Sequence, residues 1–334
     1  MKEAYLYKKL KNEKLRCDLC SHRCVIEDEN KGICSVRKNI KGTLYTLVYD
    51  KIIAENVDPI EKKPLFHFLP GSLSLSIATP GCNFKCFFCQ NWQISQTPSD
   101  HDRIEGKEIK PEKIVSDALR YNCKSISYTY TEPTIYFELA YDTAKIARGN
   151  GLKNVFVTNG FMTKECLDMI KPYLDAANID LKSFSEDFYK EKIGGRLAPV
   201  LDNIRLMYEM GIWIEVTTLL IPTLNDSVEE LKKIAEFLAG VSEKIPWHIS
   251  AYYPQYKSDI PATNVKSVMK AVEIGKKSGL KYVYGGNIPG NSSEDTFCSN
   301  CGNLVLKRAG FSILDNKIRD GLCSNCNSKI DGIF

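Results

Sequence analysis

Short apolar stretches alternate with amphipathic stretches through the middle of the chain. Six apolar stretches have the length and the β-branched and aromatic content of strands: residues 73–79, 125–131, 153–158, 176–182, 213–220 and 247–253. Between them apolar residues recur with helical spacing, for example over 111–121, 133–148, 202–210 and 227–238. A seventh short strand is predicted over 282–284. This alternation predicts βαβ units, and hence an α/β fold with a parallel sheet.

Four of these strands carry polar residues at alternate positions. Ser127, Thr129 and Thr131 share one face of the second strand, and Glu215 and Thr217 share one face of the fifth. Parallel strands buried on both faces usually read as continuous apolar runs, so the polar faces predict a sheet that wraps around a polar cavity. A closed eight-stranded barrel fills its interior with branched apolar side chains, so we expect a partial barrel. The alternative is a doubly wound sheet with partly solvated faces.

Polar residues also stand at the ends of successive strands. They are Cys82 after the first strand, Glu132 after the second, Asn159 after the third, Asp180 and Lys182 at the end of the fourth, and His248 in the sixth. Singly, each has a structural explanation: a turn residue, an ion pair or a core histidine. Because the carboxyl ends of barrel strands meet at one mouth, together they predict a ligand site.

Composition sets broad limits on the class of protein. The chain has 334 residues, enough for about two domains or for one barrel with additions. Its hydrophobic content of 43% and charged content of 26% are those of an ordinary globular protein. The net charge of +4 indicates no strong attraction to nucleic acid or membrane. Residues 1–16 lack the apolar core of a secretory signal, so we expect a cytoplasmic protein.

Eleven of the thirteen cysteines fall in three tight groups, which is metal-site spacing rather than a disulfide framework. In the middle group Cys82, Cys86 and Cys89 have C-x3-C-x2-C spacing. Three thiolates this close can hold three corners of a [4Fe–4S] cluster, which normally takes four cysteine ligands. One iron would stay open, as in catalytic metal sites. The alternative, a row of buried cysteines on a helix, is opposed by the turn signal at residues 80–81.

This cysteine run, with its aromatic neighbours, resembles the signature of the radical S-adenosylmethionine (SAM) enzymes. The resemblance implies a partial (β/α)6 barrel and a catalytic [4Fe–4S] cluster on Cys82, Cys86 and Cys89, whose open iron is chelated by SAM. It also implies reductive cleavage of SAM to methionine and a 5′-deoxyadenosyl radical, which abstracts hydrogen from a substrate. An electron donor of the ferredoxin or flavodoxin type follows from the same chemistry.

Residues 131–133, 158–160 and 180–182 resemble motifs of the activating-enzyme branch, typified by pyruvate formate-lyase activating enzyme. In that branch two glycines stand where this chain has Tyr130 and Thr131. The resemblance implies that SAM is held by Glu132 at its amino group, by Asn159, Asp180 and Lys182 at its ribose and carboxylate, and by the nearby His248. The target is either a glycine of a partner enzyme or a small molecule.

Residues 58–67, 86–92, 246–250 and 282–287 resemble, more closely still, the radical SAM component of the AmmeMemoRadiSam system. This resemblance covers nearly the whole chain. It implies association with Memo-type and AMMECR-type proteins. Tyr252, Tyr253 and Gln255 are expected near the mouth, as substrate contacts or as part of the barrel rim.

Two further cysteine groups flank the middle zone. The last group, Cys298, Cys301, Cys323 and Cys326, forms two C-x2-C knuckles, for which zinc is the usual occupant and a rubredoxin-like iron the alternative. The first group, Cys17, Cys20, Cys24 and Cys34, suits either zinc or a second cluster, and His22 could replace one ligand.

We therefore expect a cysteine-rich segment (1–71), a partial barrel (72–290) and a metal-ribbon module (291–334). The leading hypothesis is a radical SAM enzyme. The alternatives are a non-enzymatic zinc-ribbon protein that binds nucleic acid or protein, which the weak net charge opposes for nucleic acid, and an electron carrier with several clusters.

Overall fold

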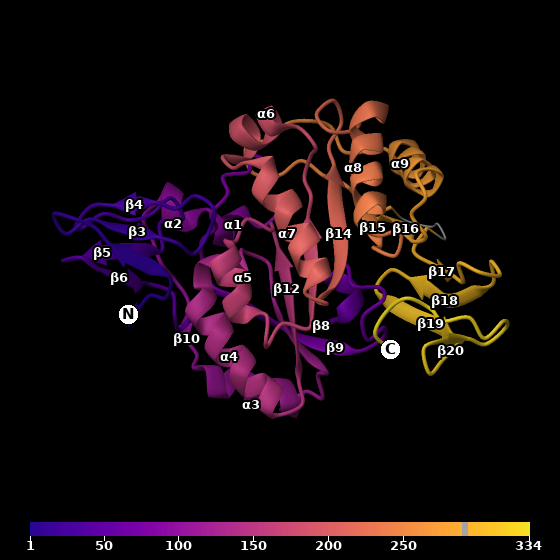
Figure 1. The fold of residues 1–334 in the computed structure, drawn as a ribbon, viewed down its shortest axis with the longest axis horizontal. Helices are drawn as coiled ribbons and strands as arrows, with labels where there is room; N and C mark the ends of the chain where they lie inside the picture. The colour runs from indigo at the N-terminus through magenta and orange to yellow at the C-terminus, as the bar shows by residue number, and fades with distance from the viewer. Residues whose placement is uncertain (289–292) are drawn as a thin grey trace.

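The computed structural model describes residues 1–288 and 293–334 (Figure 1). Within them the largest element is a sheet of eight strands in the order β16-β15-β14-β13-β12-β11-β9-β8. The strands are β8 (Ala54–Pro59), β9 (Leu73–Ala78), β11 (Ser125–Tyr128), β12 (Lys153–Thr158), β13 (Ala176–Asp180), β14 (Trp213–Leu220), β15 (Trp247–Ala251) and β16 (Val283–Gly286). Those from β9 to β16 run parallel, and β8 pairs with β9 antiparallel. The seven strands expected from the sequence are all confirmed.

The parallel strands follow one another across the sheet in chain order, without a reversal. Right-handed crossovers between strands in this order place the connecting helices on one face. A doubly wound sheet requires a reversal of strand order, so that alternative is wrong. The sheet ends at β8 on one edge and at β16 on the other.

The helices that connect the strands cover the outer face of the sheet (Figure 1). They include α3 (Pro111–Arg120), α4 (Phe137–Gly149), α5 (Lys164–Ile170), α7 (Leu197–Glu209), α8 (Val228–Val241) and α9 (Val265–Lys277). Helices α5, α8 and α9 are each preceded by a capping residue whose side chain accepts a hydrogen bond from the first turn: Thr163, Ser227 and Asn264. The core lies under these helices and contains fully buried residues of alternate strand positions, such as Ile126 and Phe156.

The segment that connects β8 to β9 covers the inner face of the sheet near the amino ends of the parallel strands. Ile60 and Phe68 of this segment pack on Val155 and Ala176 in a separate apolar cluster. Polar residues of the inner face bond to its backbone: the Glu215 carboxylate accepts from the amides of residues 66 and 67, at 3.0 and 2.8 Å. Glu215 therefore binds the backbone of the chain itself, and only the polar residues toward the carboxyl ends of the strands are free to line a cavity.

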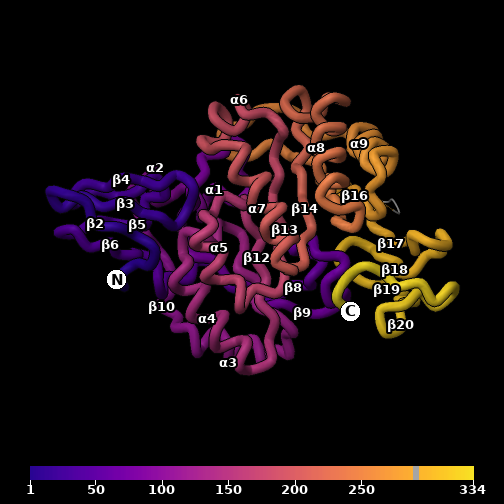
Figure 2. The backbone as a smooth tube through the Cα atoms, viewed as in Figure 1, coloured from indigo at the N-terminus to yellow at the C-terminus, as the bar shows by residue number. Residues whose placement is uncertain are grey.

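Small sheets flank the large one at both ends of the chain (Figure 2). The N-terminal part holds the sheets β1-β6-β5 and β2-β3-β4, built from β1 (Lys2–Glu3), β2 (Tyr7–Lys9), β3 (Leu15–Cys17), β4 (Val25–Ile26), β5 (Arg37–Ile40) and β6 (Thr43–Thr46). The two-stranded sheet β10-β7 pairs β7 (Lys51–Ile52) with β10 (Lys107–Glu108). The C-terminal part holds β17 (Thr296–Phe297), β18 (Leu304–Ala309), β19 (Ser312–Asn316), β20 (Ile318–Arg319) and β21 (Leu322–Cys323).

The large sheet also draws on residues before position 72, because β8 is one of its strands. The expected boundary between residues 290 and 291 lies outside the described residues. The division into three parts therefore stays a prediction. No helix in the described part of the chain combines the length and the apolar character needed to cross a bilayer.

Candidate active site

The loop that carries the middle cysteine group begins where β9 ends. Gly81 has a φ of +106°, and a Cβ atom there would lie 2.8 Å from a methyl carbon of Val36, so both conformation and space require glycine. The loop then runs without helix through Cys82, Cys86 and Cys89 to α1 (Trp92–Ser95). The interpretation of these cysteines as a buried row on a helix is therefore wrong.

The three thiols face one cavity, with a volume of about 410 Å³. In the described part of the chain no three of their Sγ atoms lie within 4.8 Å of one another, so they are spread too widely for a single ion. Burial raises the pKa of Cys86 to about 12, so a bound metal must displace the proton before this sulfur can act as a ligand. The amide of Phe84 points at the Cys82 sulfur from 3.4 Å, a contact that suits a thiolate. This donor set fits an iron–sulfur cluster.

The same cavity gathers seven of the eight residues predicted for the site. They are Cys82, Cys86, Cys89, Glu132, Asn159, Asp180 and Lys182. The hydroxyl oxygen of Thr217, on β14, also lines it, is buried, and has no hydrogen-bond partner among the described residues. An unsatisfied buried hydroxyl costs free energy unless a ligand or water reaches it, so the cavity fits a polar ligand.

Glu132 ties the ends of two strands together. Its Oε1 accepts hydrogen bonds from the amide and hydroxyl of Thr134 and from the hydroxyl of Thr158, the last at 2.7 Å. Its Oε2 accepts one bond, from the Asn159 amide at 2.8 Å. A carboxylate oxygen has two lone pairs, so Oε2 can accept one more donor from the cavity. Burial raises the pKa of Glu132, and these four donors oppose that rise.

Asp180 and Lys182 form an ion pair of 2.8 Å at the end of β13. Burial alone would lower the pKa of Lys182, but the Asp180 carboxylate outweighs it and raises that pKa above its ordinary value. The ammonium therefore stays charged beside the cysteine loop. Asp180 and Lys182 thus form an ion pair inside the sheet and also line the predicted ligand site, so the two interpretations made from the sequence apply to the same residues.

Tyr130 has the backbone conformation that a glycine would adopt in its place, with a φ of +62°. Such a φ is a strained state for a bulky residue. Its hydroxyl donates to Asp58, its carbonyl accepts from the side chain of Asn91 at 2.8 Å, and the ammonium of Lys63 lies 4.5 Å from its ring centre. These contacts hold the strained turn at Tyr130 in place.

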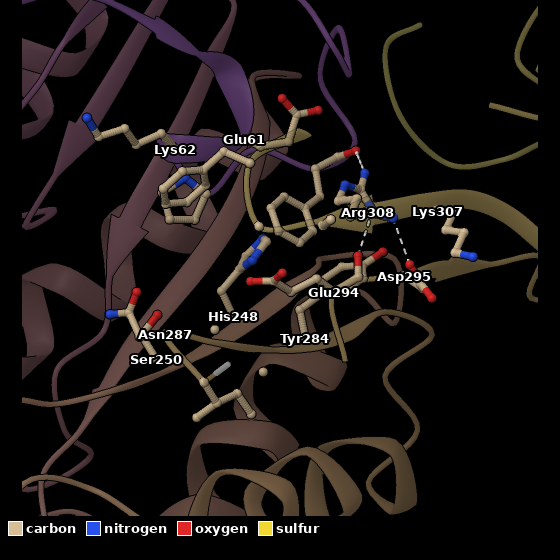
Figure 3. A pocket seen from close by; sticks show the side chains of 18 residues that line it. Glu61, Lys62, His248, Ser250, Tyr284, Asn287, Glu294, Asp295, Lys307 and Arg308 are labelled. Atoms are coloured by element: carbon tan, nitrogen blue, oxygen red, sulfur yellow. Dashed lines mark hydrogen bonds between the residues drawn. The ribbon is translucent and has the colours of Figure 1, made fainter. Parts of the chain in front are cut away.

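A second cavity, of about 800 Å³, adjoins the first (Figure 3). Lys62, Ser250 and Asn287 line both. His248 lines this second cavity and not the first, and its Nε2 lies 2.7 Å from Oε2 of Glu215. The structure therefore separates His248 from the other predicted site residues.

Arg308 reaches the second cavity from β18 and is buried. Its Nη atoms donate to the carbonyls of Glu294 and Phe66 (Figure 3). One of them also donates to the hydroxyl of Thr296. Its Nε has no partner among the described residues. Of the residues expected at the rim, Tyr252 is fully buried, and neither Tyr253 nor Gln255 lines either cavity.

Sequence reasoning did not select several residues that shape the site. Asn83 is fully buried, and its side-chain oxygen accepts from the Asn159 amide group at 2.7 Å. Lys63 and Asn287 line the first cavity from opposite ends of the chain. Asn287 follows the Gly285–Gly286 pair at the end of the seventh strand, and this position at a strand end could have identified it from the sequence. No spacing marks Lys63.

The last cysteine group has single-ion geometry. The Sγ atoms of Cys298 and Cys326 are 3.7 Å apart, those of Cys301 and Cys323 are 3.8 Å apart, and all four lie within 4.8 Å of one another. A tetrahedral zinc with bonds of about 2.3 Å places its sulfurs about 3.8 Å apart. This group can therefore hold a metal ion such as zinc.

Comparisons with known proteins agree with this geometry. Residues 76–238 match the model of the Radical SAM superfamily. An uncharacterized protein of Methanocaldococcus jannaschii is 45% identical over 335 residues, which cover 99% of each chain. The pyruvate formate-lyase-activating enzyme of Clostridium pasteurianum is 22% identical over 179 residues, which cover 50% of this chain and 72% of that enzyme. A radical SAM methyltransferase from Sphaerobacter thermophilus has a similar fold, with a TM-score of 0.51 and 16% identity over 71% of each chain.

Proposed function

Because the chain belongs to the radical SAM superfamily and is an enzyme of that class, we propose that its 410 Å³ cavity holds a [4Fe–4S] cluster on Cys82, Cys86 and Cys89 with SAM beside it. When bound, the cluster supplies the electron that cleaves SAM to methionine and a 5′-deoxyadenosyl radical. The observation that carries the proposal is that one cavity joins the three cysteines to polar residues at the ends of successive strands. The parallel strands follow one another without a reversal of order, and the segment between β8 and β9 covers part of the inner face of the sheet. Both observations support a partial barrel around this cavity.

The polar residues would hold SAM through complementary groups. Lys182, charged beside Asp180, suits the SAM carboxylate, with which an ammonium forms a charge-assisted hydrogen bond. The free lone pair on Oε2 of Glu132 suits the SAM amino group. Asn159 and Asp180 are the candidates for the ribose. By closing over SAM these residues would keep water away from the reacting centre.

We propose that the adjoining 800 Å³ cavity receives the target. It meets the first cavity at Ser250 and Asn287, and its size is that of an ordinary ligand site. His248 would then contact the target rather than SAM. The likeness to a pyruvate formate-lyase-activating enzyme favours a glycine of a partner protein as the target, with a small molecule as the alternative.

Partners and the remaining metal site belong to the same proposal. Memo-type and AMMECR-type proteins are candidates for the partner, and a ferredoxin- or flavodoxin-type protein for the electron donor. Zinc on Cys298, Cys301, Cys323 and Cys326 would let the ribbon fold with a small core. We place the protein in the cytoplasm, where thiols stay reduced. A purely zinc-ribbon binding protein is not favoured, because the ribbon leaves the site at Cys82 unexplained.

The proposal is tested under anaerobic conditions. The protein is reconstituted with iron and sulfide, reduced with dithionite and supplied with SAM, and 5′-deoxyadenosine is quantified by chromatography. We expect product from the wild type and from Cys123→Ala, which alters a buried thiol outside the three groups, and none from Cys86→Ala. Product from Cys86→Ala at the wild-type rate would refute the site.

The target class is tested by isotope transfer. Candidate partner proteins are grown on deuterated glycine and added to the reaction. Deuterium in the 5′-deoxyadenosine would identify a protein glycine as the target. If deuterium appears only with a deuterated low-molecular-weight extract, the target is a small molecule and the activating-enzyme analogy is wrong.

A further inference from the structure

The first cysteine group forms a site of its own next to the cavity at Cys82. Cys17, Cys20, Cys24 and Cys34 line one small cavity, together with His22 and Arg37. Four converging thiols with no disulfide, of which Cys17 and Cys34 are buried and Cys20 and Cys24 are half-buried, indicate a metal-binding site.

The spread of the sulfur atoms separates a cluster from a single ion. In the described part of the chain, no three of these four Sγ atoms lie within 4.8 Å of one another. The ribbon group, by contrast, has sulfur pairs at 3.7 and 3.8 Å, as a single tetrahedral ion requires. The first group thus resembles the group at Cys82, Cys86 and Cys89, which is also too wide for one ion. Larger spacing suits a cluster, because its ligands bind different metal atoms.

The surrounding charges suit an anionic metal centre. Arg37 is only 2% exposed, and it donates to the Glu138 carboxylate at 3.0 Å and to the carbonyl of Tyr5 at 2.8 Å. Its Nε has no partner among the described residues, although the side chain lines the cavity. A buried guanidinium N–H without a partner is costly, and the sulfur atoms of a cluster would accept from it.

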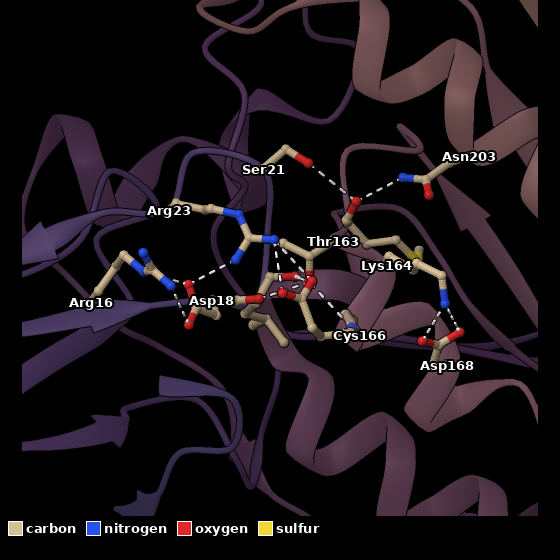
Figure 4. A network of polar contacts seen from close by, with 12 residues as sticks. Arg16, Asp18, Ser21, Arg23, Thr163, Lys164, Cys166, Asp168 and Asn203 are labelled. Atoms are coloured by element: carbon tan, nitrogen blue, oxygen red, sulfur yellow. Dashed lines mark hydrogen bonds and ion pairs between the residues drawn. The ribbon is translucent and has the colours of Figure 1, made fainter. Parts of the chain in front are cut away.

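The first cysteine group is tied by polar contacts to helix α5 and to the residue that caps it (Figure 4). Asp18, next to Cys17, pairs with Arg16 at 2.7 Å and with Arg23 at 2.8 Å, and Arg23 reaches Glu165 on α5 at 2.9 Å. The Thr163 hydroxyl donates to the Asp18 carbonyl at 2.7 Å. Loops that are tied down in this way do not need to reorganise when the metal centre changes its charge.

Two contacts join this site to the loop that carries Cys82. His22 places its Nε2 2.8 Å from the carbonyl of Asn83. On the other side, a Cβ atom on Gly81 would lie 3.5 Å from the carbonyl of Cys34, so the two cysteine segments are in contact.

One buried cation stands directly beside a cysteine of the middle group, because Lys85 precedes Cys86 in the chain. The Nζ atom of Lys85 is buried and has no hydrogen-bond partner among the described residues. The contacts of His22 with the Asn83 carbonyl and of Gly81 with the Cys34 carbonyl hold the two cysteine segments against each other, so a charge on Lys85 is positioned to affect both centres.

We propose that Cys17, Cys20, Cys24 and Cys34 hold a second iron–sulfur cluster rather than zinc, and that it passes electrons one at a time to the cluster at Cys82. In this step a one-electron carrier protein is oxidised, the second cluster is reduced and then reoxidised, and the cluster at Cys82 gains the electron. The metal assignment stands on its own observations, whereas the electron transfer rests on the proposed function.

The metal assignment is tested in a variant that lacks the other cluster ligands, Cys82→Ala combined with Cys86→Ala and Cys89→Ala. After anaerobic reconstitution we expect about four irons and about one zinc per chain, with an electron paramagnetic resonance signal on reduction. About two zincs and no iron would overturn the assignment. Because this variant keeps the first group intact, its result is independent of whether the wild type cleaves SAM.

The electron transfer is tested with Lys85→Gln. Loss of a positive charge disfavours the reduced form, so the midpoint potentials of both clusters should become more negative. Lys266→Gln, an exposed lysine of α9, is the matched control and should move neither. If Lys85→Gln shifts the midpoint potential of the Cys82 cluster alone, the coupling is overturned. A second variant, Cys20→Ala, removes the second cluster. If a carrier protein then reduces the Cys82 cluster at an unchanged rate, the electron transfer is overturned as well.

Discussion

Replacement of Asp58 should destabilise the turn at Tyr130 and weaken SAM binding. The Asp58 carboxylate accepts from Lys63 at 2.6 Å, from Lys62 at 2.8 Å and from the Tyr130 hydroxyl. Burial would raise the pKa of Asp58, but these three donors lower it below its usual range. The side chain of Lys63 is 1% exposed, so Asp58→Ala leaves a buried cation without its partner.

The magnitude follows from that burial. Removing one partner of a buried ion pair costs about 3–5 kcal/mol, and a hydrogen bond to a charged group is worth about 1.5–3 kcal/mol. Both depend on the same carboxylate, so they do not add, and we expect a loss of about 4 kcal/mol. Lys62→Gln breaks the exposed half of the same network and should cost at most about 1 kcal/mol.

The assay has a global and a local part. Urea unfolding gives the loss of stability, and hydrogen exchange over residues 125–136 reports whether the turn opens. Because Tyr130 holds a strained φ only while its contacts persist, exchange there should rise in Asp58→Ala and stay at the wild-type rate in Lys62→Gln. If both variants lose the same small stability and bind SAM as the wild type does, Asp58 does not support the site.

Two other predictions concern buried acceptors and buried bases. Glu132→Gln places an amide donor opposite the Asn159 N–H, where the carboxylate had accepted a hydrogen bond. The loss of about 1.5–3 kcal/mol should raise the dissociation constant for SAM about 10- to 100-fold, measured by equilibrium dialysis. An unchanged dissociation constant would exclude Glu132 as a residue that holds SAM. Burial lowers the pKa of His67 from 6.5 to about 4, so its neutral form stabilises the fold fully above pH 6.5. As the pH falls from 6.5 to 4, about 3 kcal/mol should be lost and the loss should then level off, whereas His67→Phe should lack this pH dependence in urea titrations between pH 7 and 4.

Much of the fold could be predicted because apolar stretches and helical spacing report burial directly. Strands β9, β11, β13 and β15 end earlier than expected. The largest difference is in β11, which stops at Tyr128, because Tyr130 adopts a left-handed turn that a bulky residue rarely takes. The polar strand faces were correctly read as an inner face. Alternation alone, however, cannot distinguish a ligand from the chain's own backbone, and Glu215 in fact binds the segment that plugs the sheet.

The candidate site was predictable where one residue follows one strand. Glu132, Asn159, Asp180 and Lys182 all reach the cavity, because the ends of parallel strands meet at one edge. His248 is in register with Thr217, but it lies one strand further across the sheet, on β15, where it lines the second cavity and Glu215 holds it. Lys63 and Asn83 enter through long-range packing, for which the local sequence carries no signal.

The link between the plug and the far end of the chain sets an order of folding events. Phe68 pairs with Ile333, and the amide of Leu69 donates to the Ile333 carbonyl. This contact joins positions 265 residues apart in the chain, so it forms late, after most local structure. During synthesis the segment 60–68 can pack on Val155 and Ala176 as soon as those strands exist, but its contact with Ile333 must wait until the ribbon is made, and until then this edge of the segment is open to chaperones and proteases.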